Sequence, residues 1–311
     1  MSDVALLILF NHNYEANLDR LKTIYAGRFE DIYFIMPFYT GSRKDVISVH
    51  GNSYYFQGYV AKALDQLKHL DYEHYAVVGD DLMLNPAINQ NNYKDYFKVD
   101  EKTAFIPGIF LLNDLKEGRP NRKYPPYWPW NERILQFSTR VDGVEVEKFL
   151  PSKEEAAARL RQHGFNFTSR MPWEIFYGRS ARKYLFEQKR WWKTLKYFVR
   201  NTASINKDLA YPLVGSYSDI VIIPRGCVNQ MIQYCGVFTA LELFVEVALP
   251  TALALSADSI SQETNERRGE TYWNDDIGKL ETKYHNTLNE LMNGFHPQSL
   301  YIHPVKLSRW K

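Results

Sequence analysis

The chain has 311 residues, of which 45% are hydrophobic, 24% charged and 15% aromatic, and its formal net charge is +2. This composition excludes an intrinsically disordered chain, which would carry fewer apolar residues and a larger net charge. The near balance of charge gives the protein no overall attraction to nucleic acid, so we expect no nucleic-acid partner. The two cysteines, Cys227 and Cys235, are too few for a disulfide scaffold and favour a reducing compartment.

The two most apolar stretches predict neither export nor a membrane span. Residues 4–10 form a short apolar run that lacks the basic segment and the small-residue cleavage site of a secretory signal. Residues 235–257 are interrupted by Glu242, Glu246 and Pro250, which disfavour a membrane-spanning helix. We therefore expect a soluble, cytoplasmic protein.

The first hundred residues alternate between strand and helix patterns. Continuous apolar runs predict buried strands at residues 4–10, 32–36 and 74–78, with a shorter strand at 46–49. Apolar residues at helical spacing predict two helices between them, with stripes at Leu18, Leu21 and Ile24 and at Val60, Ala63, Leu64 and Leu67. This order predicts an α/β fold of the three-layer Rossmann type, with a mostly parallel central sheet covered by helices.

The rest of the chain predicts inserted helices and then a return to α/β order. Ser152 and Glu155 have the spacing of a capping box that opens a helix ending near Gly164. The later elements that we expect are strands at 219–223 and 300–302, a helix at 240–248 that ends near Pro250, and a long amphipathic helix at 277–291. One α/β domain with inserted helices fits this pattern better than two separate domains.

Two adjacent carboxylates, Asp80 and Asp81, follow the predicted strand at 74–78. In open parallel sheets, ligands bind at the carboxyl ends of the strands. Neighbouring carboxylates need a cation or several hydrogen-bond donors to offset their repulsion, and a divalent ion shared with substrate phosphates is a common solution. The segment therefore predicts a metal site, and an ordinary Asp-rich turn is the alternative.

The segment Gly79-Asp80-Asp81, placed after a strand, resembles the DxD motif of GT-A glycosyltransferases, of the kind that makes bacterial polysaccharides and lipid-linked glycans. This resemblance implies a Mn²⁺ or Mg²⁺ cofactor bound by Asp81, with Asp80 on the metal or on the ribose of a nucleotide-sugar donor. The residues after the first strand, Asn11, His12 and Asn13, are similar to the loop that binds the nucleotide base and ribose in that family.

Two further candidates, His303 and Lys306, follow the last predicted strand. The resemblance assigns His303 to the metal and Lys306 to the donor diphosphate, where an ammonium group would offset the charge that develops on the leaving group. Both side chains also fit an exposed C-terminal tail, and His296 is a rival for the metal.

The acidic residues of the last third of the chain supply candidates for a catalytic base. Glu242 and Glu246 are four residues apart in an apolar setting, so a continuous helix would present both on one face. The segment 244–246 is similar to the position of the base that deprotonates the acceptor in inverting GT-A enzymes. We expect Glu246 to be this base, with Glu242 and Asp219 as alternatives, and a structural ion pair is the competing interpretation.

Two segments suggest how an acceptor would be reached. Residues 179–200 contain eight basic residues and one acidic residue, and at helical spacing Lys189, Lys193, Lys196 and Arg200 share one face. Aromatic residues on the other face are typical of an interfacial helix, so we expect a peripheral contact with the inner face of a membrane. Packing of that aromatic face against the core is the alternative. The aromatic residues at 124–130 suit either sugar stacking or burial in a loop.

Together these features predict a metal-dependent glycosyltransferase that moves a sugar from a nucleotide-sugar donor to a glycan or lipid-linked acceptor. The implied GT-A-like domain has a nucleotide-binding half (1–110), an inserted loop and helical region (111–215) and an acceptor-side half (216–311). One alternative is a metal-dependent nucleotidyltransferase or phosphohydrolase, which the lack of a Gly-rich phosphate loop in the sequence disfavours. The other is a non-catalytic, membrane-associated module that binds glycans.

Overall fold

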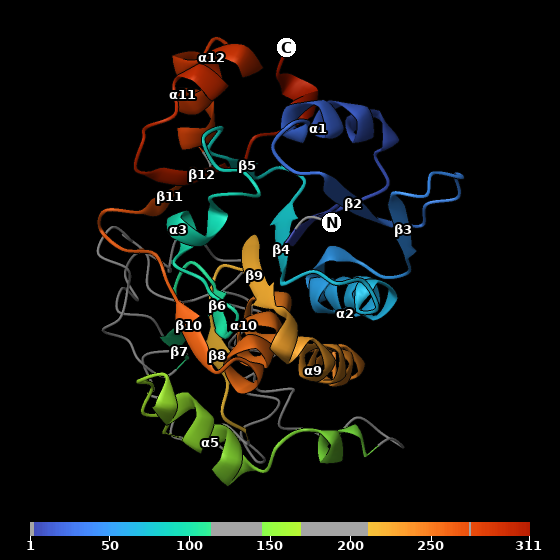
Figure 1. Ribbon diagram of the computed structural model, residues 1–311, viewed down its shortest axis with the longest axis vertical. Coiled ribbons are helices and arrows are strands. Elements are labelled where there is room, and N and C mark those ends of the chain that lie inside the picture. Colours follow the sequence, from blue (N-terminus) through green and yellow to red (C-terminus); the bar gives the residue numbers. More distant parts are fainter. Residues whose placement is uncertain (1–2, 113–144, 169–210, 274) are drawn as a thin grey trace, which may run out of the picture.

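A seven-stranded, mostly parallel sheet forms the centre of the molecule (Figure 1). The computed structural model describes residues 3–112, 145–168, 211–273 and 275–311. Strand β9 is antiparallel to both of its neighbours, β4 and β6, and the other pairs in this sheet are parallel. In spatial order the strands are β10 (Ser259–Ser261), β6 (Thr103–Phe105), β9 (Ile220–Pro224), β4 (His74–Gly79), β1 (Val4–Leu9), β2 (Asp31–Pro37) and β3 (Val46–Val49).

Helices cover both faces of this sheet, which confirms the predicted α/β class. Strand β1 shows why, because all six of its residues are buried: Ala5, Leu7 and Leu9 belong to one core cluster and Val4, Leu6 and Ile8 to the other. Alternate residues of a strand point to opposite faces, so a continuous apolar run requires cover on both. The helices that contribute to the first cluster are α2 (Phe56–Leu67), α5 (Lys153–Gln162), α9 (Val228–Ala240) and α10 (Val245–Ser256), and those of the second are α1 (Leu18–Tyr25), α3 (Tyr93–Phe97), α11 (Asp275–Lys283) and α12 (Leu288–Asn293).

A second, three-stranded sheet joins an early part of the chain to its C-terminal part. Strand β12 (Ser299–His303) lies between β11 (Arg268–Thr271) and β5 (Met83–Leu84). It is antiparallel to β5, with Tyr301 opposite Leu84. The buried Asn85 side chain donates hydrogen bonds to the carbonyls of His296 and Ser299 and so fixes the tail to the end of β5. A third sheet pairs β7 (Phe110–Leu111) with β8 (Val214–Gly215).

Short elements and caps complete the described part of the chain. The capping box at α5 is confirmed: the Ser152 hydroxyl accepts a hydrogen bond from the Glu155 amide, and the Glu155 carboxylate accepts one from the Ser152 amide. Gly27, after α1, has a φ of +74°, as expected for a helix C-terminus. The 3₁₀ segments are η1 (Glu15–Asn17), η2 (Ser53–Tyr55), η3 (Val146–Phe149), η4 (Arg225–Cys227) and η5 (Leu307–Arg309).

The predicted helix at 240–248 is wrong, and the reason lies at Pro250. Helix α9 ends at Ala240, and α10 runs from Val245 to Ser256 with Pro250 inside it. Proline cannot donate the helical hydrogen bond to the carbonyl four residues earlier, which here belongs to Glu246. That carbonyl instead accepts a hydrogen bond of 3.0 Å from the backbone amide of Ser216. The helix therefore tolerates its proline because a neighbouring segment satisfies the open carbonyl.

The single long helix predicted at 277–291 is also wrong, because the chain forms two helices there. Helix α11 ends at Lys283 and α12 begins at Leu288. Between them, His285 and Asn286 have φ values of 50° and 53°, a left-handed conformation that ends an α-helix. The apolar positions were correctly identified, since Leu280, Tyr284 and Leu291 are all buried in one core cluster.

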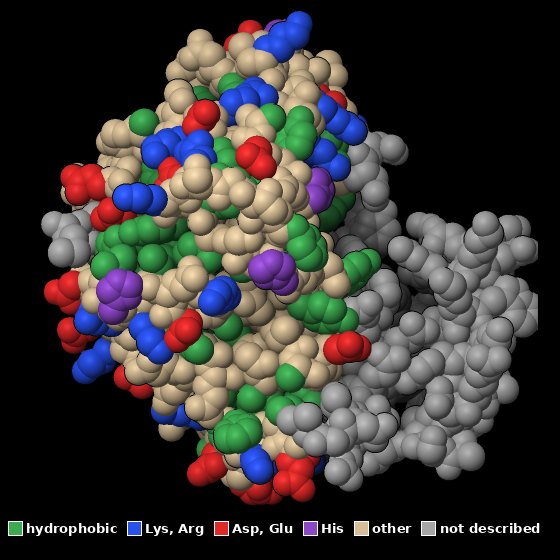
Figure 2. All heavy atoms as spheres, turned by 90° about the vertical axis from the view of Figure 1, so that its right-hand side faces the viewer, with side chains coloured by type: hydrophobic (Ala, Val, Ile, Leu, Met, Phe, Trp, Pro, Cys, Tyr) green, Lys and Arg blue, Asp and Glu red, His purple; other side chains and the backbone are tan. Residues whose placement is uncertain are grey.

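Several expectations concern the surface and the segments outside the described residues. The basic segment 179–200 and the aromatic segment 124–130 lie outside the described residues. Within the described part of the chain, none of the helices has both the length and the apolar character that a bilayer crossing requires. Figure 2 shows acidic and basic side chains intermixed over the face on the right of Figure 1, which agrees with the small net charge.

The buried histidine of β4 should make stability pH-dependent. The ring of His74 is fully buried between the Tyr93 hydroxyl and the carbonyl of Asp100, each at 2.8 Å, and burial lowers its pKa. The unfolded chain therefore binds more protons as the pH falls below about 6.5, so stability is lost on acidification. We expect His74→Phe to lower the free energy of unfolding by about 1–3 kcal/mol at pH 7.5, since it leaves the buried Tyr93 hydroxyl without this partner and removes one of the two hydrogen bonds to the Asp100 carbonyl. Urea unfolding should show a smaller decrease between pH 7.5 and 5 for the variant than for the wild type, and an equal decrease would contradict this assignment.

Candidate functional site

The predicted acidic pair lies where two neighbouring parallel strands end. Asp80 and Asp81 follow β4, and the Asp80 amide donates a hydrogen bond of 2.9 Å to the carbonyl of Leu9 at the end of β1. Gly79 donates a hydrogen bond of 2.9 Å to the Asp219 carbonyl just before β9. These backbone contacts hold the ends of β1, β4 and the start of β9 together, which is the edge where ligands bind in open sheets.

The C-terminal strand carries His303 to this edge. The backbone amide of Val305 donates a hydrogen bond of 2.6 Å to the Asp81 carbonyl. The His303 Nε2 atom lies 3.2 Å from Asp81 Oδ1, and its Nδ1 atom lies 3.7 Å from Asp219 Oδ2. The structure therefore brings together two predicted metal ligands, Asp81 and His303, that are far apart in the sequence.

Three carboxylates determine the charge of the buried imidazole. Only 6% of His303 is exposed. Burial opposes its protonation, but the nearby carboxylates of Asp219, Asp81 and Glu246 outweigh burial and raise the pKa of His303 to about 9. The three carboxylates therefore favour the imidazolium form of His303 when no cation is bound; a metal ligand has to be the neutral imidazole, so a cation held here would displace that proton.

Asp80 has the opposite tendency, towards its neutral form. Burial and the adjacent charge of Asp81 raise its pKa to about 7, against hydrogen bonds from the backbone amides of Asn11 and of Asp80 itself. The raised pKa reflects first the burial of this carboxyl group and second the negative charge of its neighbour. Such perturbed groups gather at functional sites more often than elsewhere.

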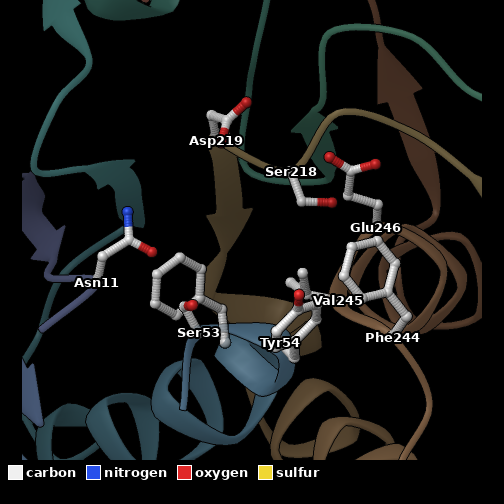
Figure 3. A pocket seen from close by; sticks show the side chains of 9 residues that line it. Asn11, Ser53, Tyr54, Ser218, Asp219, Phe244, Val245 and Glu246 are labelled. Atoms are coloured by element: carbon white, nitrogen blue, oxygen red, sulfur yellow. The ribbon is translucent and has the colours of Figure 1, made fainter. Parts of the chain in front are cut away.

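A pocket of about 220 Å³ adjoins this cluster (Figure 3). Asn11 from the end of β1 and Asp219 from the start of β9 form part of its lining. In Figure 3 the side chains of Ser218 and Glu246 lie next to each other, with the Ser218 hydroxyl directed towards Glu246, and the side chains of Tyr54 and Phe244 lie below them. The two rings are 5.7 Å apart between centroids. The pocket therefore combines aromatic surface with carboxylate, hydroxyl and amide groups.

The backbone around Glu246 is fixed by buried contacts from distant parts of the chain. Glu246 lies in the first turn of α10, where the helix dipole stabilises negative charge. Its carbonyl accepts the hydrogen bond from Ser216, two residues before the pocket residue Ser218. The fully buried side chain of Gln57 donates a hydrogen bond of 2.8 Å to the carbonyl of Leu243 and so ties α2 to the turn before α10. Glu246 is thus held on a rigid element, as a catalytic group needs to be.

The structure separates the two glutamates that the sequence placed on one helix face. Glu242 is exposed, has a φ of 53° and lies in the turn between α9 and α10. The prediction of a shared face is wrong, because the chain leaves the helical conformation between the two residues. Glu242 does not line the pocket, whereas Asp219 and Glu246 both do.

Of the remaining predicted residues, one lines the pocket and the others are exposed. Asn11 lines the pocket. His12 and Asn13 are exposed, and the Asn13 amide donates a hydrogen bond of 2.9 Å to the carbonyl of Phe38 after β2. Lys306 is exposed and directly follows Val305, the residue that is hydrogen-bonded to Asp81. The rival histidine, His296, is exposed in the turn before β12.

Sequence reasoning missed the aromatic residues of the site. Trp273 is 40% exposed. Its ring centroid lies 5.8 Å from that of His303, in a T-shaped arrangement, and 5.9 Å from that of Tyr217. Tyr54 and Phe244 were equally unforeseen. The available signal was weak: Tyr217 and Phe244 are each two residues from a predicted acidic candidate, but an aromatic residue near an acid is common in any sequence.

Asp81, Asp219 and His303 are the residues of the cluster that could contribute ligands to a divalent cation. In the side-chain positions described, no three His, Cys, Asp or Glu residues form a group that could hold a metal ion. The Asp81 and Asp219 carboxylates nevertheless lie on either side of one imidazole. Within the described residues the buried His303 Nδ1 has no hydrogen-bond partner. Carboxylate oxygens are the ligands that Mg²⁺ and Mn²⁺ prefer, and a neutral imidazole is a ligand of transition metals rather than of Mg²⁺.

The sequence matches no protein-family model and no curated protein sequence. The fold and the site together define an α/β protein with a mostly parallel sheet and an acidic cluster around a buried histidine at the strand ends.

Proposed function

We propose that the protein is a GT-A-like glycosyltransferase that moves a sugar from a nucleotide-sugar donor to a glycan or lipid-linked acceptor. One observation carries the proposal: residues from the end of β4, the start of β9, the start of α10 and the end of β12 converge on one cluster beside a pocket. An ordinary Asp-rich turn would not recruit a buried histidine and two further acids from distant segments.

In this proposal the donor binds at the acidic cluster. Asp81 and His303 would hold a divalent cation, with Asp80 beside them, and the cation would neutralise the donor diphosphate. Asn11, with His12 and Asn13 after it, contacts the nucleoside. The exposed Lys306 directly follows Val305, whose amide is hydrogen-bonded to Asp81, and it contacts the diphosphate. Trp273 offers an exposed ring next to His303 for contact with the base or the sugar.

Glu246 supplies the base that the acceptor needs. Glu246 is one of the residues that line the pocket, and there its carboxylate accepts the proton of an acceptor hydroxyl. The freed oxygen attacks the anomeric carbon, a new carbon–oxygen bond forms, and the bond to the donor phosphate breaks to release a nucleoside diphosphate. A positioned base of this kind contributes roughly 10²–10⁴-fold to the rate. Asp219, between His303 and the pocket, positions the imidazole through their 3.7 Å contact.

The products of turnover separate this proposal from its alternatives. With a nucleotide sugar, Mn²⁺ and a mixture of glycan acceptors, we expect release of nucleoside diphosphate that depends on the acceptor, measured by chromatography. Release of inorganic phosphate or pyrophosphate would instead indicate a phosphohydrolase or nucleotidyltransferase. Binding of glycans with every nucleotide sugar left intact would indicate a non-catalytic module.

A further inference from the structure

The pocket beside the acidic cluster differs from the cluster in both size and chemistry. Its volume of about 220 Å³ is below the roughly 300–1,000 Å³ typical of pockets for drug-sized ligands. A whole nucleotide sugar exceeds it, whereas a single sugar ring suits it. The pocket therefore takes one ring of a larger substrate.

The charge of the lining excludes a phosphate group. Among the described residues that line the pocket, Asp219 and Glu246 are acidic and none is Lys or Arg. Phosphate recognition relies on cationic side chains or on backbone amides at a helix start. The first residues of α10 do lie in the lining, but the carboxylates of Asp219 and Glu246 beside them would repel a dianion. The ligand that fits is neutral, so the nucleotide part of the donor lies elsewhere, at the cluster.

The arrangement of aromatic and polar groups matches a pyranose ring. Tyr54 is 54% exposed, and its ring lies 5.7 Å from that of Phe244. A pyranose has C–H faces that pack on aromatic rings and hydroxyl groups around its edge. Ser53 supplies a hydroxyl group for that edge, and Glu246 supplies a carboxylate.

From these observations we propose that the pocket between Tyr54, Phe244 and Glu246 is a monosaccharide subsite for the terminal ring of the acceptor glycan. The ring packs against Tyr54 and Phe244, and one of its hydroxyl groups meets the Glu246 carboxylate. This inference rests on the proposed function, because it specifies which part of the acceptor that reaction uses. It adds an aromatic platform that sets the identity of the acceptor, separate from the groups that bind the donor.

Saturation-transfer difference NMR tests the subsite without relying on turnover. The probes are the methyl glycosides of glucose, galactose, mannose and N-acetylglucosamine, added to the full-length protein in Mg²⁺. We expect at least one glycoside to bind the wild type, Tyr54→Ala to weaken that binding by about tenfold, and Tyr54→Phe to keep it. Phe149→Ala is the matched control, because Phe149 is 51% exposed in η3 and does not line the pocket, so its affinity should be unchanged.

The donor is measured in parallel by calorimetry with nucleotide sugars. If the wild type binds a nucleotide sugar but none of the glycosides, the subsite is wrong and the proposed function stands. If Tyr54→Ala weakens the nucleotide sugar as much as the glycoside, the pocket belongs to the donor and the inference is overturned. If neither class of ligand binds the wild type, both the subsite and the proposed function fail. Melting curves of each variant establish that it is folded, and Phe244→Leu repeats the test at the second ring.

Discussion

Replacing Glu246 with Gln is expected to lower the rate of sugar transfer by about 10²–10⁴-fold, because the amide cannot take a proton from the acceptor. The substitution keeps the size of the side chain, and the backbone contact between the Glu246 carbonyl and the Ser216 amide does not depend on it. Nucleotide-sugar affinity should therefore change little, so the loss appears in kcat rather than in donor binding. Steady-state kinetics with saturating donor, together with calorimetry of donor binding, measure both quantities.

Glu242→Gln is the matched control for this prediction. Glu242 lies four residues earlier and is the same chemical group, but it is exposed in the turn between α9 and α10 and does not line the pocket. Its replacement should leave the transfer rate unchanged. Equal rates for the wild type and Glu246→Gln, or an equal loss in the two variants, would show that Glu246 is not the base.

Replacing Asp81 with Asn is expected to abolish metal-dependent donor binding, with an affinity loss of at least about 100-fold. Loss of partners that only orient a metal ligand already reduces metal affinity by about 10–100-fold, and a ligand contributes at least as much. The fold should survive, because the Asp81 carbonyl that accepts the Val305 hydrogen bond remains in the variant. Calorimetric titration of the nucleotide sugar in Mn²⁺ gives the affinity, and thermal unfolding reports on the fold.

An exposed aspartate gives the control for Asp81. Asp65 forms a surface pair with Lys68 at 2.7 Å on α2, and Asp65→Asn removes the same charge away from the cluster. Donor affinity should be the same as in the wild type. A folded Asp81→Asn protein that binds the donor as tightly in Mn²⁺ as the wild type would exclude Asp81 as a metal ligand.

The parts of the fold that the sequence predicted are those fixed by local patterns. Strands β1 and β4 are continuous apolar runs because both of their faces are buried, so their position and the acidic pair after β4 could be read directly. The capping box of α5 is equally local. Each of these features is determined by a few adjacent residues and needs no knowledge of what packs against them.

The features that failed depend on contacts between distant segments. Nothing in residues 240–250 indicates that Ser216 will satisfy the carbonyl left open by Pro250, and this contact is what lets α10 continue to Ser256. Because α10 begins at Val245 rather than at the predicted residue 240, Glu242 and Glu246 do not share a helix face. The site is thus assembled by tertiary contacts, which the hydrophobic periodicity of the sequence does not predict.

The family resemblance predicted that Asp81 and His303 lie close together. In the structure, a very short strand pairing brings them together. Strands β5 and β12 pair at only two positions, Leu84 with Tyr301 and Met83 with Ile302. Two apolar residues give too little pattern for a strand to be identified from sequence. The role of Trp273 could not be foreseen for the same reason, since its ring meets His303 only after β12 has docked.

The most direct test of the central claim, that the cluster binds a donor diphosphate through a cation, is thermal unfolding with a panel of nucleotide sugars, with and without Mn²⁺. We predict that one nucleotide sugar raises Tm by several degrees in Mn²⁺ and that EDTA removes this increase, because a ligand at 100 times its Kd stabilises the folded state by about 2.7 kcal/mol. The same ligand should leave the Tm of Asp81→Asn unchanged. Unchanged melting of the wild type with every nucleotide sugar, in either condition, would contradict the account.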